Sequence, residues 1–170
     1  YIYFSNIIFD KIKIINKINI KWCESWKGIL GAHFWLKNEF ESYLGNFKKG
    51  GGSLQEHSHG LHLLCLLLKK RKISLEHSNS FFNFFLHGKK KKYDISSSVE
   101  GYSKGIFYSY NTDLITFPAE KKISIYSPFK KYEWICNYKK NLDTIKIYKK
   151  NILIFRKNFK KTRSSEFENE

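Results

Sequence analysis

The sequence predicts a mainly β protein: a small β-sandwich or barrel body with an extended Gly-rich segment and partly helical N- and C-terminal extensions. Three observations support this prediction. Short apolar runs recur between residues 73 and 137 with polar or basic turns between them, which is typical of sandwiches and barrels. Three consecutive glycines, Gly50, Gly51 and Gly52, carry no Cβ and have the greatest conformational freedom in the chain. On both sides of the β region, apolar residues recur at helical spacings of three and four.

Charge and composition narrow the class of protein. The 170 residues suit one domain with extensions or two small domains. They include 31 Lys and Arg against 15 Asp and Glu, a net charge of +16, which is the electrostatic footprint of a nucleic-acid partner. The cations are spread along the whole chain, which favours a protein embedded in folded RNA. An aromatic content of 18% argues against disorder.

The cysteines and the apolar runs exclude two further classes. The three cysteines are odd in number and far apart, so we expect no disulfide framework and a reducing compartment. No apolar run reaches the roughly 18 residues needed to span a bilayer, so no membrane partner is expected.

Residues 1–47 are expected to form an N-terminal extension. Residues 11–20 fit the strand and the helix period equally well, so their structure stays open. The start without Met and with one acidic residue fits the remnant of an organelle-targeting segment, or an ordinary element packed on its neighbours. From Trp22 to Phe47 the apolar spacing predicts an interrupted amphipathic helix.

Residues 48–60 are predicted to contact RNA. Two lysines, three glycines and Ser53 suit an extended backbone lying along phosphates, where Lys, Ser and main-chain N–H groups are the usual donors. The alternative is a flexible linker. His57, His59 and His62 follow within six residues, but no Cys-x-x-Cys pair accompanies them. We therefore expect these histidines to hydrogen-bond RNA or water, with zinc as the less favoured alternative and no metal or cofactor.

Residues 61–138 are predicted to form the β-body. Residues 61–68 suit a short buried element, ended by a basic tetrad at residues 69–72 that either binds phosphate or forms a solvated turn. Residues 81–86 form an apolar run of strand length, predicted to be buried on both faces, and a turn with four lysines follows Gly88. Residues 105–110 and 114–117 are predicted strands around a turn at residues 111–113.

Residues 139–170 are predicted to be a basic C-terminal extension with an acidic end. Ile145, Tyr148, Ile152 and Phe155 lie three or four residues apart, as in a helix. Glu166, Glu168 and Glu170 belong to a frayed, solvated terminus.

The order of these features resembles the bacterial-type large-subunit ribosomal protein family number twenty-seven, in a diverged organellar, mitochondrial-like member. The resemblance covers about residues 48–138, in five blocks. They are the Lys-Lys-Gly-Gly-Gly-Ser stretch at 48–53, Leu-Lys-Lys-Arg at 68–71, Phe-Leu-His-Gly-Lys-Lys at 85–90, the ungapped segment 99–117, and Pro-Phe-Lys-Lys-Tyr at 128–132.

This resemblance implies a structural, non-enzymatic role in the large subunit of an organellar ribosome. The expected partners are large-subunit ribosomal RNA, neighbouring ribosomal proteins and the acceptor end of tRNA near the peptidyl-transferase centre. The expected location is the mitochondrion, with a plastid-type organelle as the alternative. The predicted RNA-binding residues are Lys48, Lys49, Gly50, Gly51, Gly52, Ser53, His57, His59, Lys69, Lys70, Arg71, Lys72, Lys89, Lys90, Lys91 and Lys92.

Two other functions fit parts of the sequence. A free RNA-binding module that regulates or processes transcripts shares the charge but lacks the aromatic motif on which such modules stack bases. An enzyme is conceivable because Glu56, His57, His59, His62 and Cys65 offer acids, bases and a nucleophile. However, no Gly-Lys-Ser/Thr phosphate loop, no His-Glu-x-x-His and no serine elbow is present.

Overall fold

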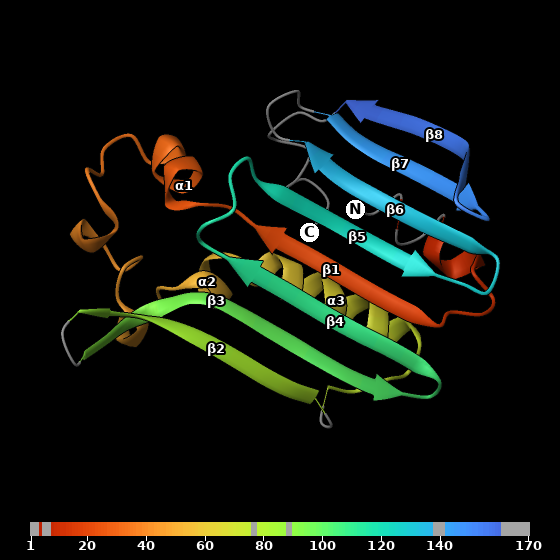
Figure 1. Ribbon diagram of the computed structural model, residues 1–170, viewed down its shortest axis with the longest axis horizontal. Helices are drawn as coiled ribbons and strands as arrows, with labels where there is room; N and C mark the ends of the chain where they lie inside the picture. Colours follow the sequence, from red (N-terminus) through yellow and green to blue (C-terminus); the bar gives the residue numbers. More distant parts are fainter. Residues whose placement is uncertain (1–3, 5–7, 76–77, 88–89, 138–141, 161–170) are drawn as a thin grey trace.

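The strands form one eight-stranded sheet in the order β2-β3-β4-β1-β5-β6-β7-β8. This computed structural model describes residues 4, 8–75, 78–87, 90–137 and 142–160. Figure 1 shows α3 running behind the centre of the sheet, with α1 and α2 at one end of it. The predicted mainly β class is therefore confirmed.

The helices and strands follow the chain in a simple order. The elements are the 3-10 turn Phe9–Lys11, β1 (Lys17–Cys23), α1 (Trp26–Ala32), the 3-10 turns Glu39–Glu41 and Phe47–Lys49, α2 (Ser53–Glu56), α3 (Ser58–Lys70), β2 (Ser78–His87), β3 (Lys90–Ser103), β4 (Ile106–Asp113), β5 (Glu120–Tyr126), β6 (Lys130–Asn137), β7 (Leu142–Lys149) and β8 (Ile152–Lys160).

The first strand of the chain lies at the centre of the sheet. β1 pairs parallel with β4, Ile20 opposite Tyr110, and antiparallel with β5, Ile20 opposite Ile123. All other strand pairs are antiparallel. A central β1 makes residues 17–23 part of the body of the fold, although they precede the predicted β region.

One face of the sheet carries the main hydrophobic core. Along β1, the buried Ile18, Ile20 and Trp22 alternate with half-buried polar residues, as expected for a strand with one covered face. Helix α3 contributes leucines at helical spacing, including the fully buried Leu64 and Leu67. The helix approaches closely at Gly60, where a Cβ would lie 2.6 Å from the Tyr110 ring. Phe4, Phe9, Ile12 and Ile15 from the N-terminal segment join the same core.

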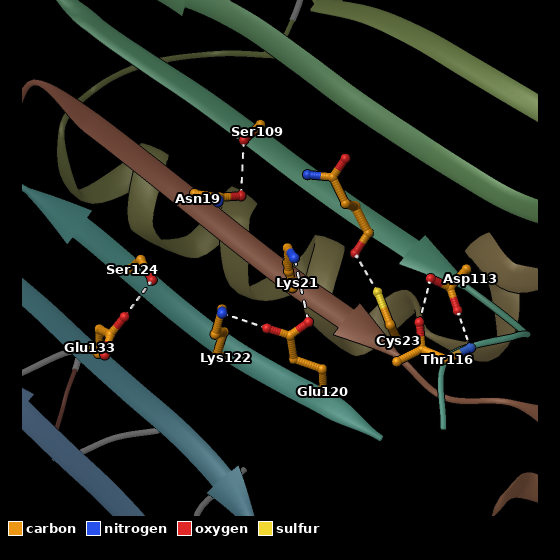
Figure 2. Close-up of polar contacts among 11 residues, drawn as sticks. Asn19, Lys21, Cys23, Ser109, Asp113, Thr116, Glu120, Lys122, Ser124 and Glu133 are labelled. Carbon is orange, nitrogen blue, oxygen red and sulfur yellow. Dashed lines mark hydrogen bonds and ion pairs between the residues drawn. The ribbon is translucent and has the colours of Figure 1, made fainter. Parts of the chain in front are cut away.

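The opposite face of the central strands is polar. It carries side chains such as Asn19, whose amide oxygen accepts a hydrogen bond from Ser109, and Ser124, which donates to Glu133. Figure 2 shows these contacts on the face turned away from α3. No helix of the described residues is long and apolar enough to cross a membrane.

Several finer expectations need correction. The sandwich or barrel is not confirmed, because the described strands form a single sheet whose edges, β2 and β8, do not pair with each other. The extended glycine-rich segment is not confirmed either. Lys48 and Lys49 belong to a 3-10 turn, Gly50 ends that turn with φ +86°, and Gly52 is the N-cap of α2.

Two predictions about helices also differ from the structure. In the segment 22–47 only Trp26–Ala32 is α-helical, and 3-10 turns follow it. The predicted C-terminal helix is wrong, because residues 142–160 form the hairpin β7–β8. Ile145 and Ile147, two residues apart, also fit the alternation of a strand, and pairing with β6 selects the strand.

Three predictions in the β region differ as well. Residues 61–68 carry the expected buried side chains, Leu63, Leu64, Leu67 and Leu68, but they belong to α3, a helix of 13 residues and not a short element. The run 81–86 is not buried on both faces, because β2 is an edge strand and Phe81 is 56% exposed. β4 continues through the predicted turn to Asp113, and no strand forms at residues 114–117.

Candidate active site

Acidic and basic side chains gather at the carboxyl end of β1, close to α1, α2 and the start of β5. Glu24 follows β1 directly, His33 caps the end of α1, and Glu56 ends α2. His57 joins α2 to α3, and Lys121 is the second residue of β5. Glu24, His33, Glu56, His57 and Lys121 together form the carboxylate–lysine cluster.

The centre of the cluster is an ion pair between Lys121 and Glu24. The Lys121 Nζ lies 2.6 Å from Glu24 Oε2, and Lys121 is only 8% exposed. The same ammonium lies 6.0 Å from the centre of the Trp22 ring. A buried ammonium needs a partner, because removing it from water is costly. The pair therefore keeps one positive and one negative charge at the carboxyl end of β1.

Glu56 is the carboxyl group whose protonation is most clearly perturbed in this cluster. Burial raises the pKa of Glu56, and the negative charge of Glu24 raises it further, while the charges of His33 and Lys121 act in the opposite direction. A partly buried carboxyl with a raised pKa is a candidate for exchanging a proton with a ligand. Glu56 is thus the residue best suited to act as an acid or base.

His57 is a buried, neutral histidine. Burial, followed by the charge of Lys121, lowers the pKa of His57 to about 4. Its Nε2 lies 3.4 Å from the Glu24 carbonyl oxygen, to which the ring donates in the corresponding tautomer. The uncharged ring is therefore positioned to hold the backbone of Glu24 in place. With a pKa of about 4, it stays neutral at pH 7.

A buried polar network fixes α2, the element that carries Glu56. Asp94 on β3 accepts hydrogen bonds through Oδ2 from the Ser53 hydroxyl at 2.6 Å and from the Leu54 N–H at 2.9 Å. Tyr110 on β4 donates to the His57 carbonyl at 2.6 Å. Because Asp94 satisfies a donor at the start of α2, it acts as a cap from a distant strand.

The glycines before α2 are required for this close packing. Gly52 has φ +112°, and a Cβ there would overlap the Asp94 carboxylate. A Cβ at Gly51 would overlap the carbonyl groups of Tyr43 and Leu44. The three-glycine stretch thus allows α2 to approach β3, which is a structural role different from the predicted contact with RNA.

Aromatic side chains border the cluster on the side of α1. The His33 Nδ1 is 2.8 Å from the Ile29 carbonyl, so a protonated Nδ1 donates to this oxygen and leaves Nε2 for another partner. The Trp35 ring lies 5.3 Å from the His33 ring and is 63% exposed. Burial and the charge of Glu56 raise the pKa of Tyr43. The cluster is therefore flanked by aromatic surface that a ligand can contact.

The polar face of the sheet has its own charged residues, which form ion pairs with each other. Figure 2 shows Glu120 between Lys21 and Lys122, and the ion pair Lys21–Glu120 measures 3.4 Å. Although burial raises the pKa of Asp113, hydrogen bonds from Thr116 and Ile115 lower it overall. Within the described residues, no group of three or more His, Cys, Asp or Glu could hold a metal ion.

The predicted RNA-binding residues do not form one surface. Ser53 and His57 are buried, and Arg71 donates to the carbonyls of Phe9 and Ile12. Lys70 forms an ion pair of 2.9 Å with Asp10. The exposed members are Lys48, Lys49, Gly50, His59, Lys69 and Lys72, whereas Gly51 and Gly52 are buried and Lys92 is half-buried. Lys89 and the side chains of Lys90 and Lys91 lie outside the described residues, and ligand binding by this set stays a prediction.

Sequence reasoning found two members of the carboxylate–lysine cluster and missed three. Glu56 and His57 are adjacent in the sequence and were considered as acid and base. Glu24 and Lys121 are 97 residues apart, and nothing in the sequence indicates their contact. His33 stands alone among aromatic residues, a pattern that predicts only packing.

Comparisons with known proteins identify the fold. No family model matches the sequence, and no curated protein matches it significantly. Among solved structures, a 3-ketoreductase from Actinomadura kijaniata, in complex with NADP and TDP-benzene, matches with a TM-score of 0.59 and 8% identity over 87% of this chain and 41% of that chain. An inositol dehydrogenase homolog from Azotobacter vinelandii, complexed with NAD+, matches with a TM-score of 0.59 and 10% identity over 91% of this chain and 38% of that chain.

A third solved structure has a similar fold. Levoglucosan dehydrogenase, in complex with NADH and levoglucosan, matches with a TM-score of 0.59 and 10% identity over 93% of this chain and 42% of that chain. The chain thus spans about two fifths of the length of each of these three proteins. At such low identity the similarity establishes the fold and not the activity.

These findings overturn the ribosomal interpretation. The structural neighbours are described as a ketoreductase and as dehydrogenases, and not as ribosomal proteins. The expected ribosomal role, the non-enzymatic assignment, and the partners ribosomal RNA, tRNA and ribosomal proteins are therefore wrong. The motif blocks misled because short glycine- and lysine-rich segments recur in unrelated folds. In this chain, Gly51 and Gly52 serve the packing of α2. By its described residues, the chain has the fold of a part of these oxidoreductases.

Proposed function

We propose that this chain is the substrate-binding part of an oxidoreductase that acts on a hydroxyl or keto group of a sugar or polyol. The observation that carries the proposal is Glu56, a carboxyl with a raised pKa beside the Lys121–Glu24 ion pair. The substrate class is taken from the three fold neighbours, which are described as a 3-ketoreductase, an inositol dehydrogenase homolog and a levoglucosan dehydrogenase.

In this proposal Glu56 holds or moves the proton of the substrate hydroxyl. The ionised carboxyl accepts a hydrogen bond from the hydroxyl and then its proton, and the protonated carboxyl returns a proton to the oxygen in the reverse direction. Lys121 provides a nearby positive charge that favours the ionised form of Glu56. His33 presents Nε2 to a second polar group of the ligand when Nδ1 donates to Ile29. Trp35 offers an exposed ring for the apolar face of a sugar.

The nicotinamide dinucleotides named for the neighbours do not fit the described residues of this chain. A common dinucleotide site has a glycine-rich turn between a parallel strand and a helix whose free N-terminus faces the pyrophosphate. Here the three glycines follow a 3-10 turn, and α2 has only four residues. At the start of α2, the Leu54 N–H already donates a hydrogen bond to the Asp94 carboxylate. We therefore assign the dinucleotide to a domain outside the described residues.

A binding experiment on the full chain tests this function. Myo-inositol and levoglucosan serve as probes in saturation-transfer NMR, with isotope labelling to follow His33 and Glu56. We expect both resonances to shift and Glu56→Gln to weaken binding about tenfold, because one hydrogen bond to a charged group is lost. Glu100→Gln on β3 is the matched control and should bind normally.

NAD+ alone is the second probe in this experiment. It should leave the same resonances unchanged, because the described residues provide no dinucleotide site. The proposal fails if neither sugar shifts His33 or Glu56 while the NMR spectrum shows a folded chain. The organellar location expected from the sequence stays a separate proposal, which imaging of the tagged full chain would test.

A further inference from the structure

Glu56 is the member of the carboxylate–lysine cluster whose charge is not matched by a hydrogen-bond donor. Its side chain is half-buried at the end of α2. Burial raises the pKa of Glu56, the charges of its neighbours modify it, and no hydrogen bond within the described residues contributes. A carboxylate that has lost part of its water is stabilised by a nearby donor or cation. The Glu56 carboxylate is therefore open to a ligand group that supplies one.

The cations and donors around Glu56 are committed to other partners. The buried Lys121 ammonium lies 2.6 Å from the Glu24 carboxylate. The His57 Nε2 lies 3.4 Å from the Glu24 carbonyl oxygen. The His33 Nδ1 lies 2.8 Å from a carbonyl oxygen of α1, and in the neutral tautomer that donates to this oxygen Nε2 has no proton to offer. None of these groups satisfies Glu56 while it keeps its own partner.

The cluster is negative when Glu56 is ionised. Lys121 and Glu24 cancel each other's charge, and His57, with a pKa of about 4, is neutral at pH 7. With His33 in its neutral form, the charge of Glu56 is left over. The chain as a whole has the opposite sign, with a net charge of +16. The cluster therefore favours a cationic ligand and repels an anionic one, which the net charge of the chain does not predict.

Aromatic side chains beside the cluster suit the same kind of ligand. Burial, followed by the charge of Glu56, raises the pKa of Tyr43, which places the phenol within electrostatic reach of Glu56. Tyr43 is half exposed, and the exposed Trp35 ring lies 5.3 Å from the His33 ring. A cation is attracted to the face of a tyrosine or tryptophan ring. A carboxylate flanked by such rings is a suitable environment for an ammonium group.

We propose that the carboxylate–lysine cluster binds an amino sugar or aminocyclitol whose ammonium group lies next to the reacting hydroxyl. One oxygen of the Glu56 carboxylate accepts a hydrogen bond from the ammonium, and the other accepts one from the hydroxyl. This substrate class rests on the proposed function, in which Glu56 receives the proton of the substrate hydroxyl. The ammonium supplies the missing cation and so holds Glu56 in the ionised form that accepts this proton.

Ligands that differ in charge test the proposal on the full chain. The neutral probes are myo-inositol and levoglucosan, the cationic probes are the amino-deoxy derivative of each with the amine beside a free hydroxyl, and the anionic probe is myo-inositol monophosphate. At pH 7 and low salt, we expect each amine to bind about tenfold more tightly than its neutral counterpart, because it adds a hydrogen bond between charged groups. The phosphate should bind more weakly than myo-inositol.

Two further measurements locate the ammonium at Glu56. In NMR of labelled glutamate, a bound amine should lower the pKa of the Glu56 carboxyl, because it stabilises the ionised form. Glu56→Gln should bind the amine and its neutral counterpart equally, whereas Glu100→Gln, at a half-buried glutamate on β3, should keep the preference. The other charged groups facing Glu56 are Glu24, His33 and Lys121, and Glu56→Gln leaves them in place.

Several results would overturn the proposal. They are equal affinity of the wild-type protein for amine and neutral counterpart, tighter binding of the phosphate, a Glu56 pKa that a bound amine leaves unchanged, and an amine preference that persists in a folded Glu56→Gln. If the neutral probes shift His33 and Glu56 but the amines bind no better, the proposed function stands and this substrate class fails. If none of the ligands shifts Glu56, both fail.

Discussion

Replacement of the buried His57 should change how the stability of the protein depends on pH. The pKa of His57 is about 4 in the folded protein, against 6.5 for an ordinary histidine. Between these values the unfolded chain binds a proton that the folded chain excludes, so the free energy of unfolding rises with pH. The difference corresponds to about 3 kcal/mol, lost progressively as the pH falls from about 6.5 to 4.

The comparison needs a variant because other groups titrate in the same range. The raised pKa of Glu56 acts with the opposite sign, since the folded chain then binds the proton more tightly than the unfolded chain. His57→Gln keeps an amide where the ring was but cannot titrate. We expect the wild-type protein to lose about 3 kcal/mol more than His57→Gln between pH 7 and pH 4. His59→Gln, at an exposed histidine two positions later, is the control and should follow the wild type.

Urea unfolding followed by tryptophan fluorescence measures these free energies at each pH. NMR of labelled histidine gives the protonation of the His57 ring directly. Parallel loss of stability in the wild type and in His57→Gln would refute the reasoning. A His57 ring that titrates near pH 6.5 in the folded protein would refute it as well, because burial would then not exclude the proton.

Three further predictions address the packing of the fold. Leu64→Ala should lower the free energy of unfolding by about 2–5 kcal/mol in urea titrations, because this leucine is fully buried between α3 and the sheet. Gly52→Ala should destabilise more than Gly50→Ala in the same assay: both glycines have positive φ, but only at Gly52 would the Cβ overlap a buried carboxylate, that of Asp94. Burial raises the pKa of the Cys23 thiol to about 12, so alkylation followed by mass spectrometry should modify Cys23 at pH 8 only once the chain is unfolded.

Local patterns predicted some elements well and others poorly. β1 combines the alternation of Ile18 and Ile20 with polar neighbours, but the same stretch also fits a helical period, and pairing with both β4 and β5 decides for the strand. In β7, Ile145 and Tyr148 suggested a helix, yet each lies on a strand that pairs with β6. Short apolar runs satisfy both periods, so tertiary pairing makes the choice.

The candidate site illustrates the same limit for function. Glu56 and His57 are neighbours in sequence and could be considered together as acid and base. The contact of Glu24 with Lys121 beside them could not be predicted from the sequence, because these two residues meet only when β1 and β5 pair. The carboxyl end of a strand brings together residues that are distant in the chain.

The amino-acid sequence was enough to predict a chain that is rich in β-structure, strongly basic and able to bury a core, because these properties are sums over residues. It also marked residues 50–52 as a special backbone segment. The contacts of the folded chain were needed to show that these glycines let α2 pack against Asp94, and that Glu56 lies beside an ion pair. Both depend on contacts between strands far apart in sequence, and such contacts leave no local periodicity to read.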